Sequence, residues 1–237
     1  SSGAAVGITA AASDSDGTTN GITYSLSSNP GSLFAIDGST GVVTLSGSLD
    51  YETATSHTIE VTATSDDTST STQSYKIAVT DFDEYDVSAV SDDDSNENTL
   101  AENASSGAAV GITAAASDSD GTTNTITYSL SSNPGNLFEI GSSSGIVTLS
   151  STGSLDYETA TSHTIEVTAT SADASTSTAS YDIAVTDVDE YDVTTPTDGN
   201  GATNEIDENA NAGTVGITAS ASDEDGTTNT ITYSLTN

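Results

Sequence analysis

The sequence VTDVDEYD at Val185–Asp192 has a near copy, VTDFDEYD, at Val79–Asp86, and this recurring stretch is the most informative feature of the chain. Each copy begins as a β-strand and then becomes a group of carboxylates with no basic residue nearby. Two carboxylates about 4 Å apart repel each other by about 1 kcal/mol in water and by about 4 kcal/mol near a protein surface. Several of them gathered in one place therefore need a counter-charge.

The chain itself cannot supply that charge. It has 36 acidic residues against a single Lys or Arg, and its formal net charge is −35. Ca²⁺ can supply it, because this hard cation takes about six to eight oxygen ligands from carboxylates, backbone carbonyls and water. We interpret the two acidic stretches as calcium-stiffened junctions between tandem β-domains.

Composition excludes several other partners. An acidic chain repels the phosphates of nucleic acid and the surface of an anionic membrane. The 237 residues include no Cys, which excludes disulfides and thiolate metal sites. No apolar run approaches the roughly 20 residues that span a bilayer, and the first residues do not resemble a signal peptide. We expect no direct membrane insertion in this segment, and any export signal to lie outside it.

Internal repeats indicate the domain organisation. Ser1–Asn20 is identical to Ser105–Asn124, and the LDYE sequence at Leu49–Glu52 recurs at Leu155–Glu158. The period of about 105 residues is the length of one β-sandwich domain. We predict an N-terminally truncated repeat at 1–86, a complete repeat at 87–192 and a C-terminally truncated repeat at 193–237.

Apolar residues alternate with Thr and Ser in the complete repeat. Ile126, Tyr128 and Leu130 have the period of two that is typical of a strand with one buried face, and we expect Tyr128 to be a core aromatic with a hydrated hydroxyl. Similar segments lie at 138–140, 145–149, 165–169 and 181–185. No apolar stretch has helical spacing. The predicted class is all-β, with tandem Greek-key antiparallel β-sandwich domains in a linear array.

Five motifs in a fixed order resemble a cadherin repeat. They are ENA at Glu102–Ala104, DSDGTTN at Asp118–Asn124, ITYSL at Ile126–Leu130, LDYE at Leu155–Glu158 and VTDVDE at Val185–Glu190. The order is most similar to the cadherin-like repeats of large bacterial calcium-dependent surface adhesins of the RTX-adhesin type. This resemblance implies an Ig-like sandwich, Ca²⁺ as the cofactor and an extracellular location on a bacterial surface.

The resemblance also implies which residues bind calcium. For the later junction they are Glu102, Asp156, Glu158, Asp187, Asp189 and Glu190, facing Asp223, Asp225 and Asn229. For the earlier junction they are Asp50, Glu52, Asp81, Asp83 and Glu84, facing Asp118, Asp120 and Asn124. Asp14 and Asp16 would face a domain outside this sequence.

Two features depart from the family pattern. The linker reads Asp-Val-Asp-Glu-Tyr where the family usually has Asp-x-Asn-Asp-Asn. The downstream Asp that the family places after the Val-x-Ala strand is Ser65 in one repeat and Ser171 in the next. Asp66 or Asp67, and Asp173, are close enough in sequence to substitute for it.

The acidity has a simpler explanation, which is a solvated surface of the halophilic kind. The acids, however, gather at recurring motif positions, while the strands between them carry Ser and Thr. Asp92–Asp94 together with Glu97 is a further candidate ion site. Only Asp92 has an acidic counterpart in the next repeat, Asp198, so we favour a solvated loop there.

Catalysis is not expected. His57 and His163 occupy the same place after LDYE, and we interpret them as structural residues at the starts of strands. Paired carboxylates can hydrolyse glycosides in a cleft, but here each pair falls at a domain end. We predict no catalytic residue and no enzyme activity.

Two functions remain open. The first is a structural extender, in which calcium-stiffened repeats project a distant domain from a bacterial surface or build a filament. The second is a calcium-dependent cell-adhesion or carbohydrate-binding module. The chain has no Trp to form a platform for sugar, which favours the extender. The expected partners are neighbouring repeats of the same chain, with like chains or cell-surface glycans as further candidates.

Overall fold

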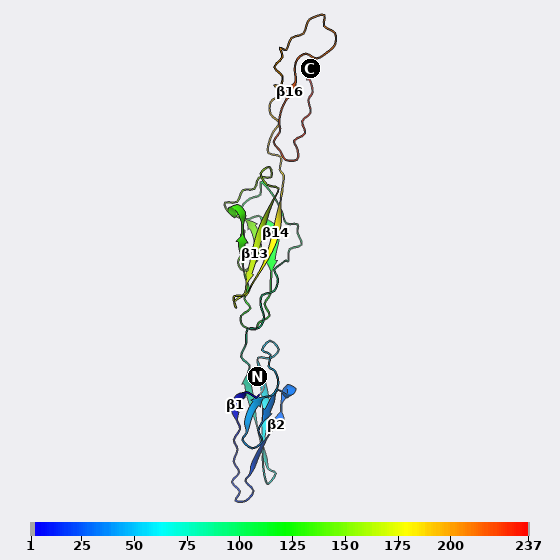
Figure 1. Cartoon of the computed structure of the whole chain (residues 1–237). Helices are drawn as coiled ribbons and strands as arrows, with labels where there is room; N and C mark the ends of the chain where they lie inside the picture. The colour runs from blue at the N-terminus through cyan, green and yellow to red at the C-terminus, as the bar shows by residue number, and fades with distance from the viewer. Residues whose placement is uncertain (1–2, 237) are drawn as a thin grey trace. The chain divides into compact units, whose positions relative to one another are not determined.

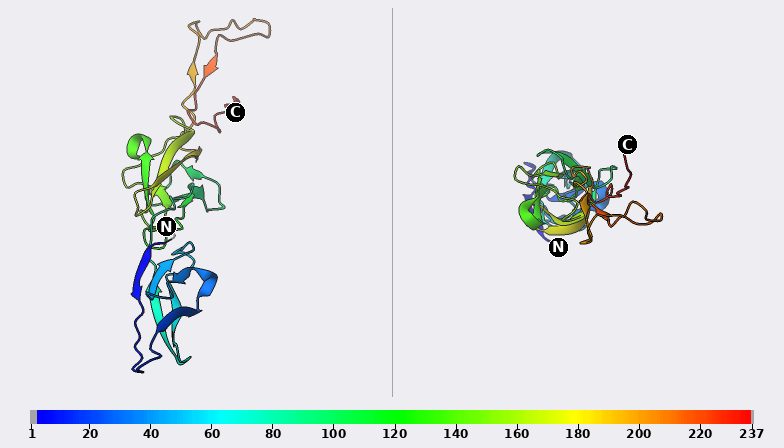
Figure 2. Two further views of the ribbon diagram at one scale, coloured as in Figure 1. Left: turned by 60° about the horizontal axis from the view of Figure 1, so that its bottom comes forward. Right: turned by 90° about the horizontal axis from the view of Figure 1, so that it is seen from above.

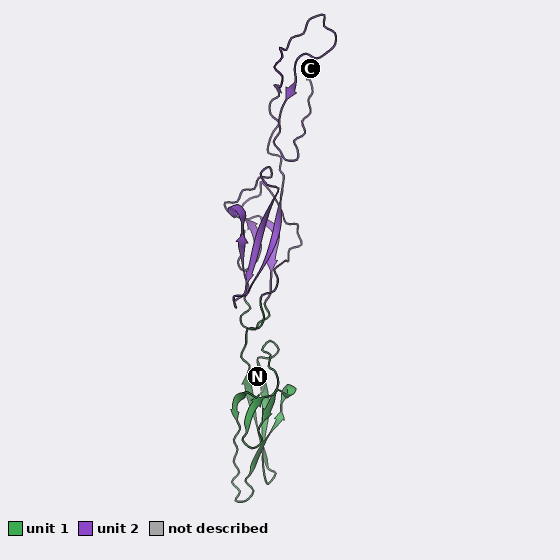
Figure 3. Cartoon of the chain, viewed as in Figure 1, with its two compact units in different colours: residues 1–86, 118–124 green, residues 87–117, 125–237 purple. Residues whose placement is uncertain are grey.

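The computed structural model describes residues 3–236, which fall into two compact units (Figure 3). Unit 1 comprises 1–86 and 118–124, and unit 2 comprises 87–117 and 125–237. Each unit thus combines segments of more than one sequence repeat, and the repeat boundaries at 86 and 192 stay a prediction. Within residues 3–236, no helix is long and apolar enough to cross a bilayer.

Unit 1 is built from two antiparallel sheets. One has the order β1-β4-β3, with β1 (Ala5–Thr9), β4 (Val42–Leu45) and β3 (Phe34–Ile36), and the short 3-10 turn η1 (Pro30–Ser32) precedes β3. The other has the order β2-β5-β6, with β2 (Ile22–Ser28), β5 (Ser56–Ser65) and β6 (Thr70–Ala78). Both sheets contribute to one core, because Phe34 and Val43 from the first pack with Ile59 and Ile77 from the second.

Unit 2 contains two four-stranded sheets, with β13 and β14 labelled in Figure 1. The first has the order β10-β13-β14-β8, with β10 (Thr127–Ser132), β13 (Ser162–Thr170), β14 (Thr176–Thr186) and β8 (Thr99–Ala101). The second has the order β11-β12-β9-β7, with β11 (Phe138–Ile140), β12 (Ile146–Leu149), β9 (Ala109–Ala115) and β7 (Ser91–Asp92). The 3-10 turn η2 (Pro134–Asn136) precedes β11.

The last part of unit 2 is a smaller element. β15 (Thr197–Asp198) and β16 (Ala219–Ser220) pair antiparallel, and a long loop connects them (Figure 2). Most side chains of this loop are exposed, including Ile206.

The predicted alternation forms the core of unit 2. Ile165, Val167 and Ala169 of β13 are fully buried, while Glu166 and Thr168 between them are only partly covered. Such alternation buries one face of a strand and leaves the other to solvent. The strand segments predicted at 138–140 and 145–149 are confirmed as β11 and β12, which pair antiparallel and place Phe138 opposite Leu149. The all-β sandwich class is therefore confirmed.

β8 is the element that positions the acidic site. It runs parallel to the end of β14, with Leu100 opposite Val185, whereas the other paired strands among residues 3–236 are antiparallel. Leu100 belongs to the buried core, and the backbone amide of Glu102 donates a hydrogen bond to the carbonyl of Thr186 at 3.1 Å. Glu102 therefore lies beside the end of β14.

The histidines and Tyr128 have structural roles. His57 in β5 and His163 in β13 are each the second residue of their strand, and each ring packs edge-on against a Phe, at 5.9 Å from Phe34 and 6.0 Å from Phe138. The hydroxyl of Tyr128 accepts a hydrogen bond from the amide of Ala116 at 3.0 Å. The hydroxyl is thus bonded to the backbone, and its hydration stays a prediction.

Candidate metal centres

Glu102 is a buried carboxylate held by the backbone. Its side chain is 9% exposed, and its two oxygens accept hydrogen bonds from the amides of Tyr157 and Val188, both at 2.6 Å. Hydrogen bonds from amides to an ionised carboxylate are short and strong. They hold this negative charge at the end of β14 and beside the LDYE sequence.

Four more carboxylates form two overlapping groups with Glu102 in unit 2. Oxygens of Glu102, Glu158 and Asp187 lie within 4.8 Å of one another, and so do oxygens of Asp187, Glu190 and Asp225. Asp187 belongs to both groups. The single basic residue of the chain, Lys76, lies on β6 opposite Thr58. The five acids, which we call the unit 2 cluster, have no basic side chain to neutralise them.

Two oxygens of the unit 2 cluster are buried without a hydrogen-bond partner among the described residues. Asp225 is 1% exposed, and its Oδ1 accepts hydrogen bonds from the amides of Glu190 at 3.2 Å and Tyr191 at 3.4 Å, whereas its Oδ2 has none. The Oδ2 atom of Asp187 accepts a hydrogen bond from the hydroxyl of Thr227, whereas its Oδ1 has none. A buried charged oxygen without a partner is costly, and a bound cation removes that cost.

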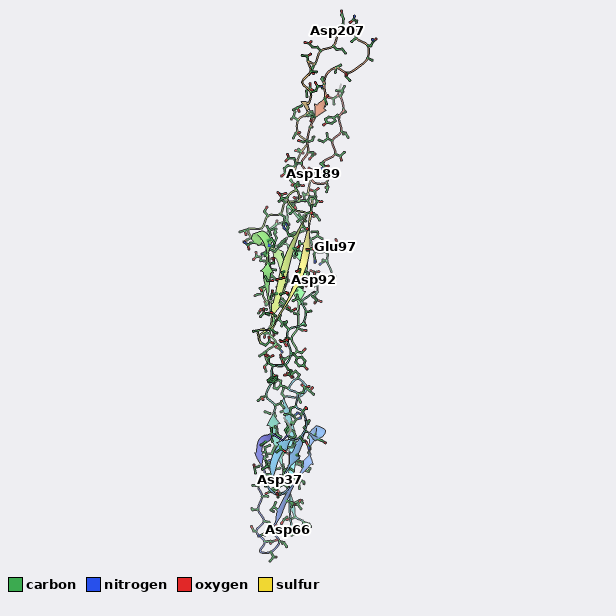
Figure 4. The ribbon with its side chains drawn as sticks, in the orientation of Figure 1. Asp37, Asp66, Asp92, Glu97, Asp189 and Asp207 are labelled. Carbon is green, nitrogen blue, oxygen red and sulfur yellow. The ribbon has the colours of Figure 1, made fainter. Side chains whose placement is uncertain are left out.

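The pKa values indicate the same excess of negative charge. Loss of water, and then repulsion by the other carboxylates of the cluster, raises the pKa of Glu190 from 4.5 to about 7. The pKa of Asp189 is also raised, because a proton on its carboxyl would be shared with the neighbouring side chain of Asp225 and because that residue is charged. Asp189 lies in the segment that follows β14, where Figure 4 labels it.

Unit 1 contains an equivalent group, the unit 1 cluster. Oxygens of Glu52, Asp81 and Asp120 lie within 4.8 Å of one another, and Asp120 is 1% exposed. The Oε1 atom of Glu52 accepts a hydrogen bond from the amide of Gly121 at 2.9 Å. Asp81 accepts a hydrogen bond from the hydroxyl of Thr122 on Oδ2, while its Oδ1 is buried and has no partner among the described residues.

The linker of unit 1 also follows the pattern of unit 2. Asp120 accepts hydrogen bonds from the amides of Glu84 and Tyr85, both at 3.2 Å. The pKa of Glu84 is raised by loss of water and then by repulsion from Glu52 and the other acids of the cluster. Two copies of one sequence motif therefore form two similar groups of carboxylates.

Several predicted ligands lie outside these groups of three. Asp156 accepts hydrogen bonds from the amide of Thr159 at 3.0 Å and from its hydroxyl at 2.8 Å, and Asp50 does the same with Thr53. These bonds lower the pKa of both carboxyls, with the hydroxyl bond contributing most.

The remaining predicted residues contact the backbone or solvent. Asp118 and Asp223 accept hydrogen bonds from the amides of Asp120 and Asp225. Asn124 donates a hydrogen bond to the carbonyl of Asp120, and Asn229 is exposed. Their role as ligands stays a prediction, as does that of Asp83.

A third acidic group lies at another place in unit 1. Oxygens of Asp14, Asp16 and Asp67 lie within 4.8 Å of one another. Ser65, at the position of the expected Asp, donates its hydroxyl to Oδ2 of Asp14 at 2.5 Å. Asp66, labelled in Figure 4, instead accepts from the amide of Gly21 at 3.1 Å. Of the two alternatives in the sequence, Asp67 joins the group.

The hydrogen bonds from the hydroxyls of Thr122 and Thr227 to the aspartates were not predicted from the sequence. The sequence does contain a signal for these two residues, because Asp-Gly-Thr recurs at Asp120–Thr122 and at Asp225–Thr227. Each Thr bonds an aspartate about 40 residues earlier in the chain, and only the folded structure brings these residues together.

Comparison with known proteins identifies the repeats. The cadherin domain family matches residues 3–80 and 96–186. Human Protocadherin Fat 4 is 35% identical over 163 residues, which are 68% of this chain and 3% of that protein. The crystal structure of mouse Cadherin-23 EC22-24 has a TM-score of 0.64 at 25% identity, over 95% of this chain and 72% of the other. The Protocadherin GammaB4 extracellular domain has a TM-score of 0.69 at 23% identity, over 94% of this chain and 35% of the other.

The family match is consistent with the geometry of the acidic clusters. Cadherin domains are extracellular, non-enzymatic adhesion modules that bind Ca²⁺, and the unpartnered oxygens of Asp187 and Asp225 suit a hard cation. The sequence resemblance to cadherin repeats is confirmed over both matched segments. The chain therefore belongs to the cadherin domain family.

Proposed function

We propose that this chain supplies extender repeats, stiffened by Ca²⁺, within a cell-surface adhesin or surface filament. The observation that carries the proposal is the pair of buried, unpartnered oxygens on Asp187 and Asp225. Asp187 lies directly after β14, and Asp225 lies in the DED sequence of the following repeat. An ion bound by both residues would join the linker to the next repeat and restrict the angle between them.

The arrangement suits calcium better than magnesium. The two groups of three acids share Asp187, so we assign one ion to each group, with backbone carbonyls and water completing the shells. Ca²⁺ accepts six to eight oxygens in irregular geometry, whereas Mg²⁺ demands a near-ideal octahedron and keeps most of its water. The unit 1 cluster of Glu52, Asp81 and Asp120 would bind an ion in the same manner.

We further propose that the adhesin belongs to a bacterial surface. Its support is the identity of residues 1–20 with 105–124, since an extender needs length more than distinct surfaces. The relatives named above include human and mouse proteins, and this chain spans only 3% of Protocadherin Fat 4. The bacterial source therefore rests on the repeat pattern alone.

Carbohydrate binding is the alternative function. The most exposed aromatic residues next to the acidic clusters are Phe82, Tyr85 and Tyr191, and the chain has no Trp. A glycan array probed in calcium and in EDTA discriminates the two functions. Reproducible calcium-dependent binding of a glycan would favour the carbohydrate-binding module over the extender.

Small-angle scattering tests the extender directly. The 237-residue chain is measured in millimolar calcium and in EDTA, with Asp187→Asn as a matched variant that disrupts both groups of acids in unit 2. We expect the wild type to become stiffer in calcium, because an ion joins the linker to the next repeat, and the variant to change less. An identical distance distribution of the wild type in calcium and EDTA would rule out the extender, even if calcium binds.

A further inference from the structure

The ring of Tyr157, in the LDYE sequence, lies against Gly226 in unit 2. A methyl group built on Gly226 would lie 2.5 Å from both the Cδ1 and the Cε1 atom of this ring. Tyr51 and Gly121 have the same relationship in unit 1, again with 2.5 Å to each of the two ring carbons. Carbon atoms this close overlap, so each ring fills the space that a side chain at the glycine would need.

The ring, and not the backbone, accounts for these two glycines. Glycine is usually required where φ is positive, because other residues are strained in that conformation. Neither Gly121 nor Gly226 has a positive φ, so alanine could adopt the backbone conformation of either residue. Glycine is therefore needed in each Asp-Gly-Thr sequence because a tyrosine ring lies beside it.

The segment Asp225–Thr227 contacts the unit 2 cluster through all three of its residues. The aspartate belongs to the cluster. The amide of the glycine donates a hydrogen bond to Oε1 of Glu158 at 2.7 Å, and the hydroxyl of the threonine donates one to Oδ2 of Asp187. The ring of Tyr157 touches the central residue of the segment, so a shift at the glycine would disturb all three contacts.

Tyr157 is itself held in place. Its backbone amide donates a hydrogen bond to Oε2 of Glu102 at 2.6 Å, and its side chain packs against the buried core of unit 2. A ring packed in this way loses many contacts if it turns aside. A side chain at position 226 would therefore push the Asp-Gly-Thr segment away from the ring.

We propose that Tyr157 and Tyr51 are positioning residues of the unit 2 and unit 1 clusters, and that each ring sets the place of an Asp-Gly-Thr segment by packing against its glycine. The inference rests on the proposed calcium function, because the segment is placed correctly when its oxygens are arranged for an ion. The fit between ring and glycine also selects which repeat can follow. An LDYE repeat accepts a following repeat that has glycine after its second aspartate.

The effect on calcium follows from the difference between the ion-free and the ion-bound chain. Without an ion, a displaced segment loses the hydrogen bonds to Glu158 and Asp187. With an ion, the same displacement also separates Asp225 from the other carboxylates that share the ion. Gly226→Ala should therefore lower the calcium affinity of the unit 2 cluster by at least about tenfold.

Nuclear magnetic resonance of the 237-residue chain follows both clusters in one sample. The backbone amide of Thr227 reports calcium at the unit 2 cluster and that of Thr122 reports it at the unit 1 cluster, because each threonine bonds an aspartate of its cluster. In Gly226→Ala, calcium binding should weaken at Thr227 and stay unchanged at Thr122. Gly121→Ala is the matched control and should give the opposite result at the two threonines.

Substitutions of the ring separate positioning from other effects. Tyr157→Phe keeps the ring carbons beside Gly226 and should bind calcium like the wild type, whereas Tyr157→Ala should bind more weakly. Tyr157→Ala combined with Gly226→Ala should bind no more weakly than Tyr157→Ala alone, because the methyl group then has room. Losses that add in the double variant, or wild-type affinity in Gly226→Ala, would overturn the proposal.

The ring contact can also be observed in EDTA. An aromatic ring changes the chemical shifts of nearby protons, so the α-proton shifts of Gly226 should be the same in the wild type and Tyr157→Phe. They should differ in Tyr157→Leu, which keeps an apolar side chain against the core. Equal shifts in the wild type and Tyr157→Leu would overturn the proposed contact.

The same titrations distinguish failure of this inference from failure of the calcium function. A wild-type chain whose Thr227 amide does not respond to calcium would contradict the proposed function, and the positioning role with it. A wild-type chain that binds calcium at Thr227 with the same affinity as Gly226→Ala would overturn the positioning role alone.

Discussion

The hydroxyl of Thr227 donates a hydrogen bond to Oδ2 of Asp187, while Oδ1 of the same carboxylate is buried without a partner among the described residues. Thr122 and Asp81 have the same relationship in unit 1. A hydroxyl bound to one oxygen fixes the orientation of the carboxylate, so the other oxygen can bind an ion with little further ordering. Binding to a preorganised site costs less entropy than binding to a mobile one.

Asp187→Asn should weaken calcium binding more than any other single change in unit 2. Asp187 belongs to both groups of acids, and the substitution removes its charge while preserving its shape. We expect affinity to fall by at least about tenfold, equivalent to about 1.4 kcal/mol. Isothermal titration calorimetry measures the effect, with Asp93→Asn as the control because Asp93 is exposed and outside these groups. Equal effects of the two substitutions would indicate diffuse acidity instead of specific ligation.

Glu102→Gln should destabilise unit 2 even in saturating calcium. The carboxylate accepts two backbone amides, and an amide side chain can accept only one of them through its single oxygen. We expect a loss of about 1–3 kcal/mol in the free energy of unfolding. Chemical denaturation measures it, and Glu97→Gln, at an exposed position, should change stability little. Unfolding curves that coincide for the two variants would show that Glu102 has no such role.

Calcium affinity should depend on pH through Glu190. Its pKa is raised from 4.5 to about 7, so the folded, ion-free chain holds this proton more tightly than the unfolded chain does. This group therefore makes the ion-free protein lose stability as pH rises from 4.5 to about 7. Calcium needs the deprotonated carboxylate, so its affinity should rise over the same range.

Calorimetry at pH 6 and pH 8 checks this dependence. One unit below the pKa, the proton should weaken calcium binding by about tenfold relative to high pH. Glu190→Gln should bind more weakly at pH 8 and lose most of the difference between the two pH values. A wild-type affinity that is the same at both pH values would contradict the role of Glu190.

Chelation should lower the melting temperature of the chain. Extracellular calcium modules bind with Kd values of about 10⁻⁴ to 10⁻³ M, and a site at 100-fold excess of ion contributes about 2.7 kcal/mol. Scanning calorimetry in calcium and in EDTA measures the shift, with magnesium at the same concentration as the control for ionic strength. Equal stabilisation by the two cations would point to charge screening and not to a specific site.

Much of the fold could be predicted from the sequence because the relevant interactions are local. The alternation at Ile165 and Val167 places both side chains on one face, and the structure buries them fully. Repetition in the sequence identified acids of the candidate site. Glu158 and Asp187 lie in motifs that recur in the preceding repeat, and the structure brings their oxygens together.

The hydrogen bonds of individual side chains could not be predicted, because the motifs do not show which partners compete for each polar group. Asp156 is part of LDYE like Glu158, yet it bonds Thr159 three residues away, because a nearby hydroxyl and amide satisfy it without a metal. The bond from the amide of Ala116 to the hydroxyl of Tyr128 joins residues 12 positions apart, and sequence alternation identified only the burial of the ring.

A crystal structure of the 237-residue chain grown in calcium chloride would show whether Asp187 and Asp225 bind a common ion. We expect an ion bound by Oδ1 of Asp187 and Oδ2 of Asp225, at oxygen distances of about 2.3–2.6 Å, with Glu190 also in the shell. Density at this place that fits only water, with both aspartates hydrogen-bonded to other protein groups, would contradict it.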